Sequence, residues 1–214
     1  MAVATRCKGG STVLEAQDSK HHETAVLTAL IGRVSPLRVV EPGPANADLD
    51  QILAAGVRAP DHGRLRPWRF LLIRGDARDR FGDVLAESLK RRKQDLSQST
   101  LQAEHDKALR APLIIVVAAA VRGNTKVPAI EQIVSAGAAA QNMLVAAHAL
   151  GYGGFWRTGD AAYDGQVKQS FGLTVDDEIV GFLYLGHIET PGRPKTPDSV
   201  GVVEEWTGLP AGPA

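Results

Sequence analysis

The chain has 214 residues, 44% of them hydrophobic and 22% charged, so it is long and apolar enough to bury one sizeable core. Its 24 Lys and Arg residues balance 24 Asp and Glu residues, which excludes the strong positive field that proteins use to bind nucleic acid or anionic membranes. The single cysteine, Cys7, excludes an internal disulfide and a cysteine metal cluster, and the sequence predicts no metal site.

The two ends of the chain differ in composition from its middle. Residues 1–22 are polar, lack the apolar stretch of a secretory signal and are expected to form a flexible extension. No run reaches the roughly 20 apolar residues of a membrane span, so a cytoplasmic protein is expected. Residues 191–214 are rich in proline and glycine, and their Val202, Val203 and Trp206 favour a tail that packs on a partner subunit. The folded domain is expected at residues 23–190.

Two helices are predicted first in chain order. The stretch from Thr24 to Ile31 is apolar and free of glycine, and is expected to form a helix that ends near Gly32. The second helix follows from the spacing of Leu49, Ile52, Leu53, Gly56 and Val57, which places all five residues on one buried face before Pro60 ends the helix.

The remaining elements alternate between strands and helices. The run PLIIVVAAAV from Pro112 to Val121 predicts a central strand buried on both faces. Small residues between Ile130 and Leu150 predict a helix that lies in the core or against a second copy of itself. The other expected elements are strands at 68–73, 155–157 and 179–185, one or two exposed helices between 77 and 110, and a short helix at 166–171. This order predicts an α+β domain with a central mixed sheet flanked by helices.

Several enzyme classes lack their motifs in this sequence. No HExxH zinc helix, P-loop, GxSxG elbow or calcium loop occurs. The glycines between Gly151 and Gly154 follow a helix and precede a strand, whereas a dinucleotide-binding fingerprint follows a strand and opens a helix. They are therefore predicted to end a helix.

Three short segments place a cation beside a hydrogen-bonding residue. Arg33 and Ser35 could clamp a phosphate, or Arg33 could simply neutralise the end of the preceding helix. Arg58 and His62 flank Pro60 and could present two donors to a planar ligand, or Arg58 could pair with Asp61 on the surface. Trp156, Arg157 and Thr158 end a short strand, where Arg157 could serve a ligand or be an ordinary surface residue.

Five segments together resemble the nitroreductase family. They are Arg33-Val34-Ser35, the RAPDH and PWRF segments between Arg58 and Phe70, KVPAIEQIVSAG from Lys126, GGFWRTG from Gly153 and IVGFLYLG from Ile179. The likeness runs from about Thr24 to Gly186 in one order and spacing, and is nearest to the compact bacterial NAD(P)H nitroreductase branch.

The resemblance implies a homodimer with two FMN sites at the subunit interface and a C-terminal extension. One subunit would hold FMN through Arg33, Val34, Ser35, Trp156, Arg157 and Thr158. Arg58 and His62 would reach across from the other subunit. The segment that serves the nicotinamide cofactor in similar proteins corresponds to Ala146, Ala147, His148, Ala149, Leu150 and Gly151.

The implied activity is electron transfer from NADH or NADPH through FMN to a nitroaromatic, quinone or similar electron-poor small molecule by a ping-pong mechanism. No catalytic side chain is expected, because the flavin carries the chemistry. The alternatives are other flavin chemistry on the same fold, such as dehalogenation or flavin fragmentation, and a non-catalytic flavin-binding protein. A flavin-free interaction protein is a further alternative.

The sequence departs from the family pattern at two places. Leu37 stands two positions after the motif serine, where larger relatives place a lysine or arginine, and Arg38 follows it. The loop between Pro60 and Pro67 reads DHGRLR, where many relatives carry serines, asparagine and glutamine. We therefore expect a different group to tune the flavin and an altered substrate preference.

Overall fold

The computed structural model describes residues 25–123, 125–193, 196–206 and 208. Residues 25–32 are helical, which confirms the first predicted helix from its second residue onward. The extension predicted at residues 1–22 lies outside the described residues. The labelled elements, in chain order, are β1 (Arg38–Val40), α2 (Asn46–Gly56), η1 (His62–Arg64), β2 (Trp68–Arg74), α3 (Ala77–Arg92), α4 (Gln98–His105), η2 (Asp106–Leu109), β3 (Leu113–Ala119), α5 (Ala129–Ala149), β4 (Gly153–Arg157), η3 (Asp160–Tyr163), α6 (Gly165–Ser170) and β5 (Glu178–Thr190).

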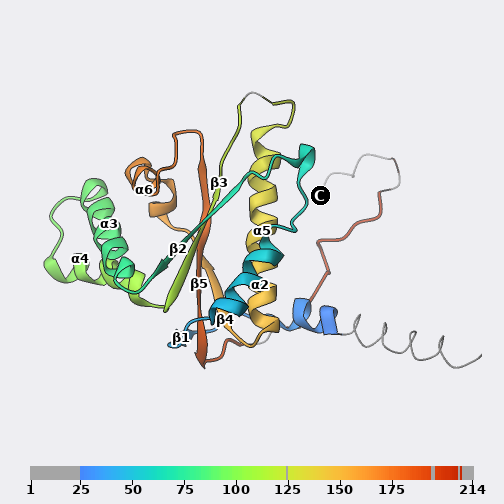
Figure 1. The fold of residues 1–214 in the computed structure, drawn as a ribbon, viewed down its shortest axis with the longest axis horizontal. Coiled ribbons are helices and arrows are strands. Elements are labelled where there is room, and N and C mark those ends of the chain that lie inside the picture. The colour runs from blue at the N-terminus through green and yellow to red at the C-terminus, as the bar shows by residue number, and fades with distance from the viewer. Residues whose placement is uncertain (1–24, 124, 194–195, 207, 209–214) are drawn as a thin grey trace, which may run out of the picture.

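The five described strands form one sheet in which β5 has three partners (Figure 1). β3 and β4 pair with the first part of β5, β1 pairs with its last part, and β2 pairs with β3. Each of these pairings is antiparallel. The sequence predicted a mixed sheet, and this part of the prediction is wrong. The predicted α+β class is confirmed.

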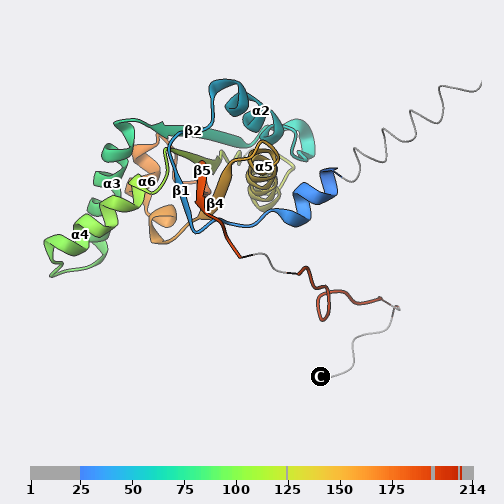
Figure 2. The same ribbon diagram turned by 90° about the horizontal axis from the view of Figure 1, so that it is seen from below.

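Helices cover both faces of the sheet, with α3, α4 and α6 at one side and α2 and α5 at the other (Figure 2). All seven residues of β3 are buried, as predicted for a central strand. Their side chains alternate between the two faces. Ile114, Val116 and Ala118 lie in the core on the α3 side, and Leu113, Ile115, Val117 and Ala119 lie in the core on the α5 side.

The small residues of α5 allow close packing, as the sequence indicated. Ala136, Ala139 and Ala140 are fully buried against the sheet. Gly56 of α2 is so close to α5 that an added Cβ would lie 2.9 Å from Cγ of Met143. The opposite side of α5 remains open, because Ile130 and Val134 are 63% and 62% exposed.

The structure corrects four details of the prediction. β1 was not predicted, because a strand of only three residues carries no readable period. β5 continues to Thr190 rather than ending at Leu185, because its polar last residues pair with β1. Val57 lies past the end of α2 and is half exposed. α3 is not simply an exposed helix, since its Phe81, Leu85 and Leu89 are buried.

The last described residues extend away from the folded body (Figures 1 and 2). Their apolar side chains, Val200, Val202, Val203 and Trp206, are between 71% and 88% exposed. Packing of this tail on a partner stays a prediction. No helix in the described ranges is long and apolar enough to cross a membrane.

Candidate functional site

The segment Arg33–Ser35 links the helix at 25–32 to β1 and is held by the end of β5 and by Gly192 beyond it. The amide of Leu37 donates to the carbonyl of Thr190 at 3.0 Å. A Cβ added to Gly192 would lie 2.0 Å from the carbonyl oxygen of Ser35, so only glycine fits there. The sequence reasoning did not identify Gly192 as a support of this segment.

Arg33 carries a buried donor that lacks a partner. Its Nη1 atom makes no hydrogen bond within the described chain. An unsatisfied buried donor costs about 1–3 kcal/mol, more when it is charged. An arginine that only neutralised the end of the helix at 25–32 could stay in solvent. The buried nitrogen therefore favours a bound anion.

The edge strand β4 ends with Trp156 and Arg157, and Thr158 comes directly after it. Successive side chains of a strand point to opposite faces of the sheet. The indole of Trp156 donates to the carbonyl of Val180 at 3.2 Å and packs in the core on the α5 side. The guanidinium of Arg157 lies over the Phe155 ring, 5.4 Å from its centroid. Trp156 is thus anchored in the core, while Arg157 faces the α3 side.

Two adjacent cavities open on that side of the sheet. The first, of about 620 Å³, is lined by the end of α3, by residues of α4 and η2, and by Trp156, Arg157 and Thr158. The second, of about 730 Å³, is lined by β1, by the end of η2 and by Leu37. Arg110, Phe155 and Arg157 line both, so the two cavities meet at these residues. Each has the size of a small-molecule site, roughly 300–1,000 Å³.

Arg58 and His62 do not join this site within one chain. His62 Nδ1 lies 2.5 Å from Oε2 of Glu131, near the start of α5. Gly32, next to Arg33, lies by His148 near the end of α5. About 25 Å of helix separates these two places, at roughly 1.5 Å per residue.

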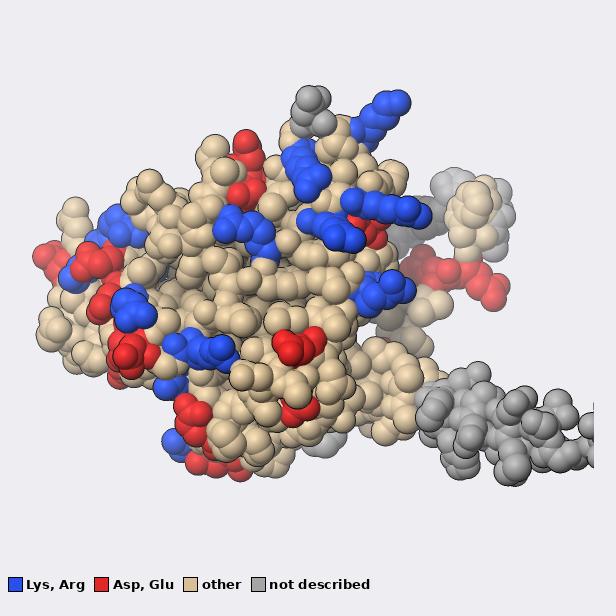
Figure 3. All heavy atoms as spheres, viewed as in Figure 1, with Lys and Arg blue, Asp and Glu red and all other residues tan. Residues whose placement is uncertain are grey.

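The loop that carries His62 is basic and strained. The carboxylate of Asp61 accepts hydrogen bonds from the amides of Leu65 and Arg66, and forms no ion pair with Arg58 among the described residues. Arg64 and Arg66 have positive φ angles of 54° and 48°, which side-chain-bearing residues seldom adopt. Figure 3 shows Lys and Arg side chains gathered over η1 and the start of β2, where these exposed arginines lie.

The segment Ala146–Gly151 lies at the end of α5. Ala147 is fully buried, and Gly151, with a φ of 86°, ends the helix as predicted. None of its six residues lines either of the two cavities. The C-terminal end of a helix carries partial negative charge, which disfavours phosphate groups. A nicotinamide contact there stays a prediction.

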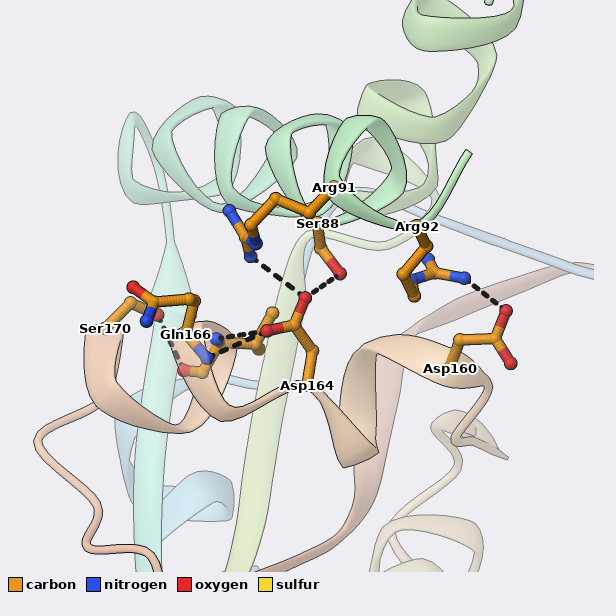
Figure 4. Close-up of polar contacts among 8 residues, drawn as sticks. Ser88, Arg91, Arg92, Asp160, Asp164, Gln166 and Ser170 are labelled. Carbon is orange, nitrogen blue, oxygen red and sulfur yellow. Dashed lines mark hydrogen bonds and ion pairs between the residues drawn. The ribbon is translucent and has the colours of Figure 1, made fainter. Parts of the chain in front are cut away.

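A polar cluster fastens α3 to the turn that follows β4 (Figure 4). Asp164 accepts hydrogen bonds from Ser88 Oγ at 2.5 Å and Arg91 Nη2 at 2.9 Å, and also caps the start of α6. Arg92 pairs with Asp160, just after Thr158 and Gly159. This cluster therefore positions the wall of the first cavity. No local sequence pattern predicts this cluster, because Ser88 and Asp164 are 76 positions apart.

Burial by itself would raise the pKa of Asp164. The hydrogen bonds from Ser88, the Gln166 amide and Arg91 outweigh burial and hold the pKa of this carboxyl below its ordinary value. Asp164 is therefore ionised in the folded protein at neutral pH.

Comparisons with known proteins agree with this fold. Residues 41–187 match the model of the nitroreductase family. The Escherichia coli (strain K12) protein named "Putative NAD(P)H nitroreductase YdjA" is 44% identical over 160 residues, which cover 75% of this chain and 86% of that protein. The chain belongs to the nitroreductase family.

Solved structures show the same fold. A nitroreductase-like family protein from Bacillus cereus has a TM-score of 0.71 at 23% identity, and the match covers 86% of this chain and 96% of that one. A structure from Desulfovibrio desulfuricans, described as a "putative nitroreductase in complex with fmn", has a TM-score of 0.65 at 25% identity, with 86% and 98% covered.

Replacing Asp164 by asparagine is expected to destabilise the protein by about 1–3 kcal/mol near neutral pH, because charge-assisted hydrogen bonds are lost. A carboxylate with a lowered folded-state pKa stabilises above its unfolded-state pKa, and this stabilisation is lost as pH falls through the folded-state value. Urea unfolding should show the gap between wild type and Asp164→Asn shrinking below about pH 4.

The matched control is Asp50→Asn, which removes an exposed carboxylate with no hydrogen bond in the described chain. It should leave the urea midpoint nearly unchanged at every pH. An Asp164→Asn gap that stays constant down to about pH 3 would show that the carboxylate charge does not stabilise this cluster.

Proposed function

We propose that the protein is an FMN-dependent NAD(P)H oxidoreductase that reduces nitroaromatics, quinones or similar electron-poor small molecules by a ping-pong mechanism. The observation that supports this proposal most directly is the buried Nη1 of Arg33, which has no hydrogen-bond partner among the described residues and lies beside Ser35 in the chain. A phosphate dianion needs a guanidinium fork and hydroxyl donors of this kind. The NAD(P)H nitroreductase name of the E. coli relative and the FMN complex of a structural relative support the same cofactors.

The residues present fit FMN. Arg33 and Ser35, with the backbone of Val34, would hold the phosphate, and Arg157, Thr158 and the backbone of Trp156 would line the ring. When bound, FMN supplies the redox chemistry, accepting electrons from NADH or NADPH and passing them to the acceptor. The protein contributes orientation, exclusion of water and donors that stabilise negative charge.

A second copy of the chain would complete the site. Ile130, Val134, Gly137 and Gln141 form one stripe along α5: three are exposed, and an added Cβ on Gly137 would meet nothing within 4 Å. The helix at 25–32 adds Val26, Leu27 and Ile31, each more than 55% exposed. Two copies packed through this face about a two-fold axis would bring His62 of one chain toward Arg33 of the other.

Turnover provides the first test. NADPH or NADH should be oxidised in the presence of a simple quinone or nitroaromatic, and double-reciprocal plots at several acceptor concentrations should be parallel, as a ping-pong mechanism requires. Tight FMN binding without any such oxidation would instead favour a non-catalytic flavin-binding protein.

Arg33→Ala should raise the Kd for FMN at least about tenfold, because hydrogen bonds to charged groups contribute about 1.5–3 kcal/mol each. Quenching of FMN fluorescence measures this Kd on protein freed of its cofactor. The control is Arg80→Ala, on the exposed side of α3 and outside both cavities. Normal FMN affinity in a folded Arg33→Ala variant would remove Arg33 from the site.

Mixed dimers test whether each site is built from both chains. A dimer of one Arg33→Ala chain and one Arg58→Ala chain has one site that lacks both arginines and one site that is intact. Such dimers, made by co-expression with two affinity tags, should regain about half of wild-type FMN occupancy, because one of two sites is restored. In the second kind of mixed dimer, one chain carries both substitutions and the other carries none. Each of its two sites then lacks one arginine, and neither site is intact. Occupancy that is equal in the two kinds of mixed dimer, or higher in the second kind, would contradict sites shared between subunits.

A further inference from the structure

Two arginines line both cavities at the place where the cavities meet. Arg110, which follows η2, and Arg157, which ends β4, line both cavities, although they are 47 positions apart in the sequence. Neither forms an ion pair or a side-chain hydrogen bond within the described residues. The sequence reasoning identified Arg157 but not Arg110.

Most other cations that line the cavities differ from Arg110 and Arg157, because they form ion pairs with carboxylates. Four of them lie within 4.0 Å of a carboxylate. Asp106, the remaining carboxylate among the cavity linings, accepts a hydrogen bond from Gln102 and lies 3.4 Å from Nδ1 of His105. Lys93 also has no partner among the described residues, but it lines the first cavity only. The pairs are Arg92–Asp160, Lys107–Glu104, Arg38–Glu189 and Arg78–Glu41. Arg110 and Arg157 therefore have no carboxylate within 4.0 Å among the described residues.

An aromatic wall adjoins the two arginines. The rings of Phe155 and Tyr184 stack with centroids 5.0 Å apart and an interplanar angle of 10°. Burial raises the pKa of Tyr184 to about 12, and the positive charges of Arg110 and Arg157 act against this rise, so both lie within electrostatic reach of the phenol. The place thus suits a flat ring with a negatively charged edge.

FMN, the cofactor of the proposed function, offers two anionic groups. Its phosphate is charged in both redox states, and Arg33 and Ser35 are already proposed to bind it. Its ring becomes an anion on two-electron reduction, because a hydride brings two electrons and one proton and leaves NAD(P)⁺ behind. The new charge lies on the N1–C2=O edge of the ring.

We propose that Arg110, together with Arg157, binds the negatively charged N1–C2=O edge of reduced FMN at the junction of the two cavities. This inference rests on the proposed function. Leu37, which lines the second cavity, carries no charge, so a cation at the junction of the two cavities comes from Arg110 or Arg157. Arg110 supplies it from the residue that follows η2 and makes the flavin easier to reduce.

The test compares FMN affinity in the two redox states. Kd is measured for oxidised FMN by fluorescence quenching and for dithionite-reduced FMN by anaerobic ultrafiltration. Arg110→Gln should weaken binding of reduced FMN at least about tenfold, as expected for loss of a charge-assisted contact, and change binding of oxidised FMN by less than about threefold. Arg110→Lys should restore most of the loss. Arg80→Gln is the control and should change neither Kd.

Each other outcome would overturn the proposal in a distinguishable way. Equal weakening in both redox states would assign Arg110 to the phosphate. No change in either state would place Arg110 outside the flavin site while the proposed function stands. Failure of the wild-type protein to bind FMN would overturn both the inference and the proposed function.

Sulfite gives a second readout without turnover. It adds to oxidised flavin and leaves the same negative charge on the N1–C2=O edge. The Kd for sulfite should therefore rise about tenfold in Arg110→Gln and recover in Arg110→Lys. An unchanged sulfite Kd in the glutamine variant would contradict a charge contact at this edge. If Arg110→Gln does not fold, Arg110→Lys still has to bind reduced FMN within about threefold of wild type.

Discussion

The pairing of β5 with three strands decides where the candidate site forms. β5 joins the buried β3 on one edge and β4 on the other, which places Arg157 opposite Phe182. Its last residues pair with β1, and the carbonyl of Thr190 then holds Leu37, just after Arg33–Ser35. Gly181 leaves room for Trp156, whose Nε1 would lie 2.0 Å from an added Cβ. One strand therefore positions both Arg33–Ser35 and Arg157.

Charge is distributed unevenly around that strand. Most surface cations near the cavities have carboxylate partners, whereas Arg33 has a buried unpartnered nitrogen and Arg110 and Arg157 face open space. The unpartnered buried nitrogen of Arg33 costs stability, because a buried donor without a hydrogen bond loses its hydration without compensation. A bound flavin would satisfy these groups, and FMN is accordingly expected to stabilise the fold as well as to enable the chemistry.

Long, strongly patterned elements could be predicted from the sequence. The apolar run of β3 and the small residues of α5 identified a doubly buried strand and a core helix, and Arg33 and Arg157 were recognised through family motifs. β1 was missed, because its three residues form a strand only when the end of β5 lies beside them. Arg110, Gly192 and the Asp164 cluster were missed for a related reason. Their roles depend on contacts between distant segments, and no local period encodes such contacts.

The central claim is that this chain binds FMN, and the most direct test is the purified protein itself. Its visible absorption spectrum should show a bound flavin, and heating should release FMN at about one per subunit. A colourless protein that also fails to bind added FMN would contradict the account, because the buried nitrogen of Arg33 would then need another anion.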